Sequence, residues 1–526
     1  MTSFNSIKYE DPSTLPFKLP AGVGEVDAAF MQAVLRHRGA IGEDVEVTSI
    51  EKSDVGMTAG YFSSIVRVKL NYSKECSAPP SMIVKSWPPF ELLSKDAIKG
   101  MFIMDMKGYS EFTGDEWYPR PNVYLASYDE SEDRWALVME DAYNFADHAV
   151  HEKPLTLEQV KIMIPALVDF AVRFEGCNEE SSPMFERTKH IPPWSAAAMT
   201  FEKVGYGGAA LFDEFTGKPD AFDVDDKEKF GFPKLAPWKS WKEDLGGDFS
   251  QLFFKAYEKY WANSAASEGA TCTVSHGDLR GDNLFFDKQD PTKWYAIDFQ
   301  LCFQGPIASD LAYLMTSGSV LPEVYTENTE EVLKMFYDLF ITKTTKYKDL
   351  TYEKFRSEYI TMTMVLYTYY VAMGAAIWQA GTMDHDGGLG ACIKEGGVGS
   401  GTISYAHLPE SEKRKRYWWI SSMNNFRVQI KQFGMMDMLK NMDQKDVDFQ
   451  AAFNTKNPRG CPWPKGEDGK FIAVDQPTAI ALSNGSLNEK KAAEIAGEDG
   501  TVTMDAFNKV VIPGWSLLAA VSQPSA

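Results

Sequence analysis

Two apolar segments joined by a polar, glycine-containing loop are the most constraining feature of this sequence. Residues 274–287 read Val-Ser-His-Gly-Asp-Leu-Arg-Gly-Asp-Asn-Leu-Phe-Phe-Asp, with apolar residues on both sides of the loop. Such flanks predict a strand before and after the loop. A further apolar run, Trp-Tyr-Ala-Ile, then leads directly to Asp298. We therefore predict a compact strand–loop–strand unit over residues 271–299, with its polar groups in the loop and after the last strand.

The polar residues of this unit are of the types that phosphoryl transfer requires. A carboxylate must orient the attacking hydroxyl and accept its proton, which suits Asp278. A second carboxylate must hold Mg²⁺ against nucleotide phosphates, which suits Asp298, and the amide oxygen of Asn283 can complete the metal's oxygen shell. His276 is expected to brace the loop rather than react. The alternative is a turn between two strands with structural acids, so the upstream sequence matters.

Phosphate-binding residues are predicted upstream of this unit. Lys85 lies inside an apolar strand, where its charge is costly unless it meets an anion such as the phosphates of ATP. Gly56 and Gly60 allow backbone amides to approach phosphates closely, and Ser63 adds a hydroxyl donor. Two glycines alone are weak support, since many hairpins contain them.

Two further contacts complete the predicted nucleotide site. Lys85 also needs a carboxylate from the helix that follows it, and the candidates are Asp105 and Glu111, of which we favour Asp105. The residues Met-Glu-Asp-Ala close the last predicted strand and include Glu140 and Ala142. Their backbone would recognise adenine as a hinge does. A simple linker between lobes is the other interpretation, and the two roles are compatible.

Composition disfavours several other classes of protein. The 526-residue chain has a formal net charge of −21, which argues against nucleic acid as a partner because phosphate backbones are held by clustered Lys and Arg. Its six scattered cysteines form no zinc spacing and no disulfide framework, so we expect a reducing, cytoplasmic location. Residues 361–380 carry no charge, but their tyrosines and threonines favour a buried helix over stable membrane insertion.

The rest of the chain divides into a β-rich part and a helical part. A polar leader and a short helix, 26–38, come first. Strand patterns follow, interrupted by one helix at 94–112. Residues 45–53 and 61–72 alternate, 81–86 is a short β-rich run, and 122–128 and 134–139 are two more strand candidates. Helical patterns dominate afterwards. We predict a leader, an N-lobe, a C-lobe and a C-terminal extension at 1–40, 41–141, 142–455 and 456–526.

The C-terminal extension contains a weak match to a calcium-binding hand. Residues 489–510 show the helix, glycine, short strand and helix of that motif, with Gly500 at the sharp turn. Among the ligand positions considered, only Asp499 is a carboxylate, and the acidic residue that ends such loops is missing. We interpret the match as degenerate or accidental and predict no calcium binding.

Taken together, the motifs resemble the ecdysteroid kinase-like and CHK-kinase-like branch of the aminoglycoside and choline phosphotransferase superfamily. The likeness covers about residues 40–430, and the Asp-Phe-Gln ending is similar to this branch in particular. It rests on five segments, namely 276–283, 297–300, 305–313 (Gly-Pro-Ile-Ala-Ser-Asp-Leu-Ala-Tyr), 83–85 and 138–141.

The resemblance implies an α+β, bilobal protein-kinase-like fold, with a small mixed β-sheet N-lobe and a large, mainly helical C-lobe. It also implies ATP and Mg²⁺ as cofactors and transfer of the γ-phosphate to a hydroxyl of a small molecule. Asp310, in the Asp-Leu-Ala helix start, would support the catalytic loop. Two positions depart from the family pattern: Asp105 stands where Glu is commoner, and Asp282 adds a carboxylate beside Asn283.

The acceptor is not identified by these motifs. The family builds the acceptor pocket in the helical lobe, where six tryptophans are candidate walls as well as candidate core residues: Trp194, Trp238, Trp241, Trp378, Trp418 and Trp419. An acidic, aromatic pocket would suit a choline-like quaternary amine through cation–π contact. A less acidic one would suit a steroid-like or other lipid-like alcohol.

Two other functions share part of this pattern. A pseudokinase or nucleotide-binding regulatory module without turnover is disfavoured because Lys85, Asp278, Asn283 and Asp298 are all present. A protein kinase is disfavoured because no Ala-Pro-Glu-type segment follows Asp298 before the Asp-Leu-Ala helix. The oligomeric state stays open.

Overall fold

The computed structural model describes residues 9–55, 64–87, 95–109, 118–150, 153–188, 191, 271–380, 421–422, 424–435, 437, 472–482, 489–503 and 506. The chain separates into two compact units. The first contains residues 1–148 and 283–302, and the second contains residues 149–282 and 303–526. The boundaries of the four segments expected from the sequence stay predictions. The division into two units joins residues 283–302 to the N-terminal part.

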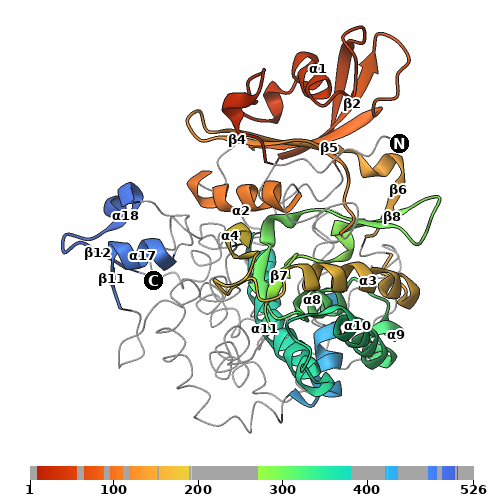
Figure 1. Cartoon of the computed structure of the whole chain (residues 1–526), viewed down its shortest axis with the longest axis vertical. Coiled ribbons are helices and arrows are strands. Elements are labelled where there is room, and N and C mark those ends of the chain that lie inside the picture. Colours follow the sequence, from red (N-terminus) through yellow and green to blue (C-terminus); the bar gives the residue numbers. More distant parts are fainter. Residues whose placement is uncertain are drawn as a thin grey trace, which may run out of the picture. The chain divides into compact units, whose positions relative to one another are not determined.

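The first unit is built on a five-stranded sheet with the order β1-β2-β3-β5-β4 (Figure 1). Every pairing in it is antiparallel, so the sheet itself is not mixed. One helix precedes the sheet and another separates β3 from β4. The elements are α1 Ala28–His37, β1 Val47–Asp54, β2 Ser64–Tyr72, β3 Ser81–Ser86, α2 Lys95–Lys107, β4 Val123–Asp129 and β5 Arg134–Glu140. All seven elements lie where the sequence pattern predicts them.

Alternation along β5 shows how the two faces of the sheet are covered. Ala136 belongs to the core that includes the buried side of α1, where Phe30 and Leu35 lie. Its neighbour Trp135 instead stacks on Phe102 of α2, with ring centroids 4.5 Å apart. Because successive side chains of a strand point to opposite faces, α1 and α2 cover opposite faces of the sheet (Figure 1).

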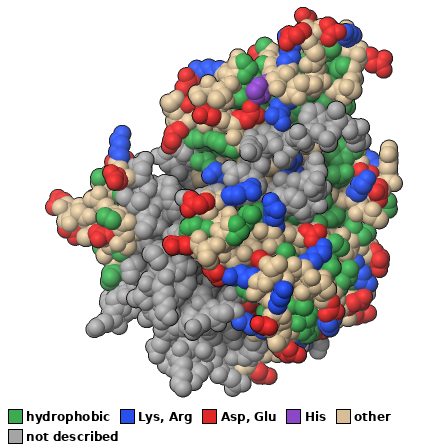
Figure 2. Space-filling view, viewed as in Figure 1, with side chains coloured by type: hydrophobic (Ala, Val, Ile, Leu, Met, Phe, Trp, Pro, Cys, Tyr) green, Lys and Arg blue, Asp and Glu red, His purple; other side chains and the backbone are tan. Residues whose placement is uncertain are grey.

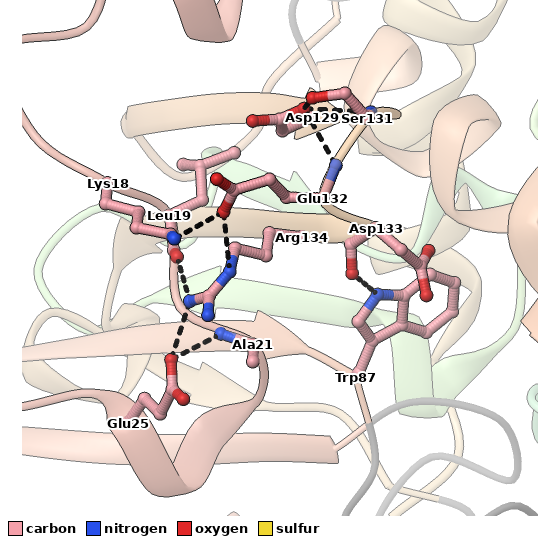
Figure 3. Close-up of polar contacts among 10 residues, drawn as sticks. All are labelled: Lys18, Leu19, Ala21, Glu25, Trp87, Asp129, Ser131, Glu132, Asp133 and Arg134. Atoms are coloured by element: carbon pink, nitrogen blue, oxygen red, sulfur yellow. Dashed lines mark hydrogen bonds and ion pairs between the residues drawn. The ribbon is translucent and has the colours of Figure 1, made fainter.

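Arg134 at the start of β5 holds the N-terminal leader against the sheet (Figure 3). Its guanidinium donates to the carbonyl of Leu19 at 2.8 Å and pairs with Glu25 at 2.7 Å and Glu132 at 3.1 Å. In the same region the indole of Trp87 donates to the carbonyl of Asp133 at 2.8 Å. Trp87 follows β3 directly, so this contact fixes the end of the strand that carries Lys85.

A second, three-stranded sheet completes the first unit. It has the order β6-β8-β9, and its strands are Ala146–His148, Leu284–Asp287 and Trp294–Ala296. Three 3₁₀ turns flank or precede these strands: η4 Ala142–Asn144, η5 Gly281–Asn283 and η6 Phe299–Leu301. The amide of Ile297 donates to the carbonyl of Asn283 at 2.9 Å. The β8–β9 hairpin therefore brings the backbone of Asn283 beside the residue that precedes Asp298.

The second unit is mainly helical. Its first long helix, α3 Leu157–Arg173, begins with a capping box in which the side chains of Thr156 and Gln159 bond each other's backbone. A short antiparallel pair, β7 Thr273–Ser275 and β10 Phe303–Gly305, precedes and follows the segment that belongs to the first unit. The other helices are α4 Phe185–Thr188, α8 Ser309–Thr316, α9 Pro322–Glu327, α10 Thr329–Lys343 and α11 Tyr352–Ala380.

These elements confirm the predicted α+β class, with an antiparallel N-terminal sheet and helices later in the chain. The uncharged segment 361–380 forms the later part of α11. Within the ranges given above, no helix is long and apolar enough to cross a membrane. On the face drawn in Figure 2, basic side chains are interspersed with acidic ones.

The C-terminal extension contains α17 Gln476–Leu482 and α18 Glu489–Ile495, with β11 Val474–Asp475 pairing antiparallel to β12 Thr501–Val502. Gly500 has a positive φ of 76°, and the carboxylate of Asp499 accepts from the amide of Thr501 at 3.0 Å. The helix, the glycine turn and the short strand expected here are therefore present. Asp499 is engaged in closing the turn.

Candidate active site

In the first unit, Lys85 lies at the centre of a buried group that we call the lysine cluster, Lys85, Asp105 and Asp298. The ammonium of Lys85 is 2.8 Å from a carboxylate oxygen of Asp105 and 2.9 Å from one of Asp298. Lys85 is 4% exposed and Asp105 1%, whereas the Asp298 side chain is 21% exposed. The structure thus brings together residues from β3, from α2 and from the end of β9, separated by up to 213 positions in the chain.

Burial by itself would lower the pKa of Lys85. The carboxylates of Asp105 and Asp298 outweigh that effect and hold the pKa of Lys85 well above its ordinary value. The side chain therefore remains a buried ammonium. A buried charge is expensive unless it is paired, so the two carboxylates are a condition for placing this lysine inside the sheet.

Helix α2 also holds the Asp-Phe-Gln segment in place. The second oxygen of Asp105 accepts from the amide of Phe299 at 2.7 Å, and the phenol of Tyr109 accepts from the amide of Asp298 at 2.8 Å. Asp298 has a positive φ of 72°, an uncommon conformation for a residue with a side chain. A Cβ added at Gly108 would lie 2.2 Å from the Cβ of Phe299, so the two backbones approach closely.

Asp298 of the lysine cluster and Asn283 provide only part of the set of oxygen ligands that Mg²⁺ requires. The Asp298 carboxylate and the Asn283 amide supply hard oxygen atoms, and Asn283 is buried. Within the part of the chain that the structure covers, no three His, Cys, Asp or Glu side chains group together as a complete metal site. Mg²⁺ characteristically uses one or two carboxylates and takes its other ligands from phosphates and water.

The predicted hinge is anchored through Asp141, which lies between the predicted residues Glu140 and Ala142. Asp141 is buried and pairs with Arg67 of β2 at 2.7 Å. Its carboxylate also accepts from the hydroxyl of Ser81 on β3 at 2.6 Å. Glu140 accepts from an Asn122 amide, and Ala142 is buried at the start of η4. The backbone that would face adenine is therefore fixed by an ion pair to Arg67 on β2 and by a hydrogen bond from Ser81 on β3.

In the second unit, the loop after β7 is held by helix α8. Asp310, at the start of α8, accepts from the amides of His276 at 2.8 Å and Gly277 at 3.1 Å. Gly277 has a positive φ of 82°, which a residue without a side chain adopts easily. Burial raises the pKa of Asp310. The nearby His276 and the two hydrogen bonds from backbone amides oppose that shift without cancelling it.

Asp278 itself is bound on several sides. The phenol of Tyr313 on α8 donates to Oδ1 of Asp278 at 2.5 Å. The guanidinium of Arg280 lies 3.3 Å from the same oxygen. The amide of Asp278 donates to Nδ1 of His276 at 3.2 Å, so His276 is part of the loop's internal bonding. We call Asp278, His276, Asp310 and Tyr313 the loop cluster.

Several predicted residues lie outside the described residues, namely Gly56, Gly60, Ser63, Glu111, Trp194, Trp238, Trp241, Trp418 and Trp419; for Trp378 only the backbone, within α11, is described. Lys85 pairs with Asp105. Glu111, the other candidate partner of Lys85, lies outside the described residues.

Sequence reasoning missed two contacts of the site. Tyr313 was visible only as the last residue of the Asp-Leu-Ala-Tyr motif, three positions after Asp310 and so on the same helix face. Arg67 could have been noticed as a cation inside an alternating strand. Nothing in its spacing points to Asp141, which lies 74 positions later.

Comparison with known proteins gives one family match. Residues 234–349 match the ecdysteroid kinase-like family, a segment that contains Asp278, Asn283, Asp298 and Asp310. No curated protein sequence matches the chain.

Several solved structures are similar at low identity. A Plasmodium vivax ethanolamine kinase shares 12% identity, with 66% of this chain and 82% of that chain covered and a TM-score of 0.35. LicA in complex with AMP shares 12%, with coverage of 76% and 98% and a TM-score of 0.32. The GDP complex of aminoglycoside 2′-phosphotransferase-IIIa shares 10%, with coverage of 76% and 99% and a TM-score of 0.38.

The family match covers three of the five segments that carry the resemblance, namely 276–283, 297–300 and 305–313, and does not extend to 83–85 or 138–141. Over residues 234–349 the chain is therefore similar to the ecdysteroid kinase-like family, as its motifs predict.

Proposed function

We propose that this protein is an ATP-dependent small-molecule kinase that transfers the γ-phosphate of ATP to a hydroxyl group. The observation that carries the proposal is the lysine cluster, in which a buried ammonium meets Asp105 at 2.8 Å and Asp298 at 2.9 Å. A structural lysine needs one carboxylate, whereas here the second is partly exposed and follows the strand that ends in Asp-Phe-Gln. This is the arrangement expected for phosphate binding beside a metal ligand.

Residues of the first unit would bind the nucleotide. Lys85 would donate to phosphate oxygens while Asp105 keeps its charge paired. Asp298 and Asn283 would hold Mg²⁺, which supplies charge neutralisation at the phosphates when bound. The hinge backbone from Glu140 to Ala142 would bind adenine, and Gly56, Gly60 and Ser63 stay proposed phosphate contacts.

Asp278 would act as the base. Its carboxylate would orient the acceptor hydroxyl and take its proton as the acceptor oxygen bonds to phosphorus and the bond to the ADP oxygen breaks. An alcohol suits this role because a carboxylate can orient and deprotonate it without a strongly shifted pKa. The family match supports a small-molecule acceptor, and we propose that this acceptor is choline-like, steroid-like or another alcohol.

Purified protein with magnesium and ATP should phosphorylate at least one of choline, ethanolamine, an ecdysteroid or a broader panel of alcohols. Mass spectrometry would detect a gain of one phosphate. Asp278→Asn should lower kcat about a thousand-fold, because general base catalysis is typically worth 10²–10⁴. Asp147→Asn, which alters an exposed carboxylate on β6, is the matched control and should keep full activity.

Full activity in Asp278→Asn, or no phosphorylated acceptor across the panel, would contradict the proposal. The regulatory alternative has its own signature. ATP would raise the unfolding temperature of the wild type, with no ADP released and no acceptor modified.

A further inference from the structure

Tyr313 is a buried tyrosine whose hydroxyl reaches the predicted base, and no part of the proposed reaction uses it so far. Its exposed fraction is 2%, and it lies in α8, where every residue from 309 to 316 is buried. Its oxygen is 2.5 Å from Oδ1 of Asp278. This separation falls within the range typical of a hydroxyl that donates to an ionised carboxylate, which is the strong form of such a bond.

The surroundings of Tyr313 show that α8 acts on the loop at more than one point. Asp310, three residues earlier on the same helix face, accepts from the amides of His276 and Gly277. Ser319, just after the helix, accepts from the amide of Gly281 at 2.7 Å. The backbone of the loop is thus fixed by Asp310 and Ser319, and its functional side chain is fixed by Tyr313.

Core packing alone does not account for this contact. A buried tyrosine needs a partner for its hydroxyl, and a neutral group is sufficient. Tyr359 on α11 illustrates that case, because its hydroxyl donates to the amide oxygen of Gln429 at 2.8 Å. Tyr313 instead donates to a carboxylate that is itself buried, where an ionised group needs hydrogen-bond donors to remain charged.

We propose that Tyr313 is the positioning residue of the catalytic base. Its phenolic O–H holds Oδ1 of Asp278, so the carboxylate is kept in one orientation toward the acceptor hydroxyl. Tyr313 keeps its own proton throughout, and the proton from the acceptor goes to Asp278. The inference rests on the proposed kinase function and specifies how its base is prepared.

Tyr313→Phe tests this role, with Tyr359→Phe as the matched control. Both substitutions remove one hydroxyl from a buried tyrosine of the second unit. Measured with the best acceptor of the panel, Tyr313→Phe should lower kcat about 10- to 100-fold, less than Asp278→Asn. The KM for ATP should change less than about two-fold. Tyr359→Phe should leave kcat unchanged.

The outcomes separate the two proposals. A wild type without any turnover contradicts the kinase function. An active wild type whose Tyr313→Phe variant has a normal kcat overturns the role of Tyr313 and leaves the kinase function standing. Inactivation as complete as in Asp278→Asn also overturns positioning, because it makes the phenol essential to the chemistry.

A crystal structure keeps the inference testable if Tyr313→Phe is unstable. In the wild-type protein the hydroxyl of Tyr313 and a carboxylate oxygen of Asp278 should lie within hydrogen-bond distance, at most about 3 Å. A separation beyond 3.5 Å would overturn the proposal whatever the activity of the variants.

Discussion

In the first unit the predicted phosphate-binding residues are held by charge pairing, whereas in the second unit the predicted base is held mainly by neutral donors. Lys85 is balanced by two carboxylates from distant segments. Asp278 accepts a hydrogen bond from the phenol of Tyr313. The backbone N–H groups of its loop donate hydrogen bonds to Asp310. Arg280 is a cation beside Asp278, at 3.3 Å.

The difference follows from what each group is proposed to do. Ion pairs can exchange partners, so an ammonium held by carboxylates is suited to accept phosphates when a nucleotide binds. A base has to keep one orientation, and directional hydrogen bonds from a buried helix provide it. The lysine cluster thus suits an ammonium that changes its anionic partners, and the loop cluster suits a carboxylate that keeps one orientation.

Removing the charge at the centre of the lysine cluster should have the largest effect. Lys85→Met leaves the carboxylate of Asp105 buried without its cation, which should cost about 3–5 kcal/mol of unfolding free energy. Urea denaturation would measure the loss, and activity should fall with it. In the second unit, Arg280→Met should cost less than Lys85→Met, since Asp278 keeps its hydrogen bond from Tyr313.

A double variant distinguishes charge imbalance from lost packing. Lys85→Met with Asp105→Asn removes both charges, and the new amide oxygen can still accept from the amide of Phe299. Most of the lost stability should return while activity stays low. Equal costs for Lys85→Met and Arg280→Met, or no recovery in the double variant, would contradict the contrast between the two units.

Two glycines test how tightly each cluster is packed. A Cβ at Gly108 would lie 2.2 Å from the Cβ of Phe299, so Gly108→Ala should displace the Asp-Phe-Gln segment and cost about 1–3 kcal/mol. A Cβ at Gly281 would meet Ser319 at 3.6 Å, an ordinary contact. Gly281→Ala should therefore change stability by less than about 1 kcal/mol. Thermal or urea unfolding of both variants would show the asymmetry; a larger loss for Gly281→Ala would refute it.

The smallest expected effect is a dependence of stability on pH through Asp310. Its pKa is raised in the folded protein by burial, so between the ordinary value near 3.9 and the raised one the native state binds more protons than the unfolded state. Stability contributed by this group therefore falls as pH rises through that window and is constant above it. The amide side chain in Asp310→Asn does not titrate, so this variant should lack the decrease in stability with rising pH.

The readout is the difference between the unfolding midpoints of wild type and Asp310→Asn, measured from pH 4 upward. It should decline with rising pH. A difference that grows with pH would show that the two hydrogen bonds from backbone amides, rather than burial, control the pKa of Asp310.

Much of the fold could be predicted because its signals are local. Alternating or β-rich runs of residues place the five strands of the first sheet. The order Asp278, Asn283, Asp298 also indicates the reaction class, because phosphoryl transfer needs those groups in a loop and after a strand.

The tertiary structure alone decided which side chains meet. Asp105 joins Lys85 at a separation of 20 positions and Phe299 at 194, and Tyr313 reaches Asp278 across 35. Such contacts carry no periodic signature, since they depend on how a helix packs against a strand end. The residue types of the site and their order were therefore readable in the sequence. The bonds that pair Lys85 and fix Asp278 arise only when distant segments are packed together, because burial makes each unpaired charge costly.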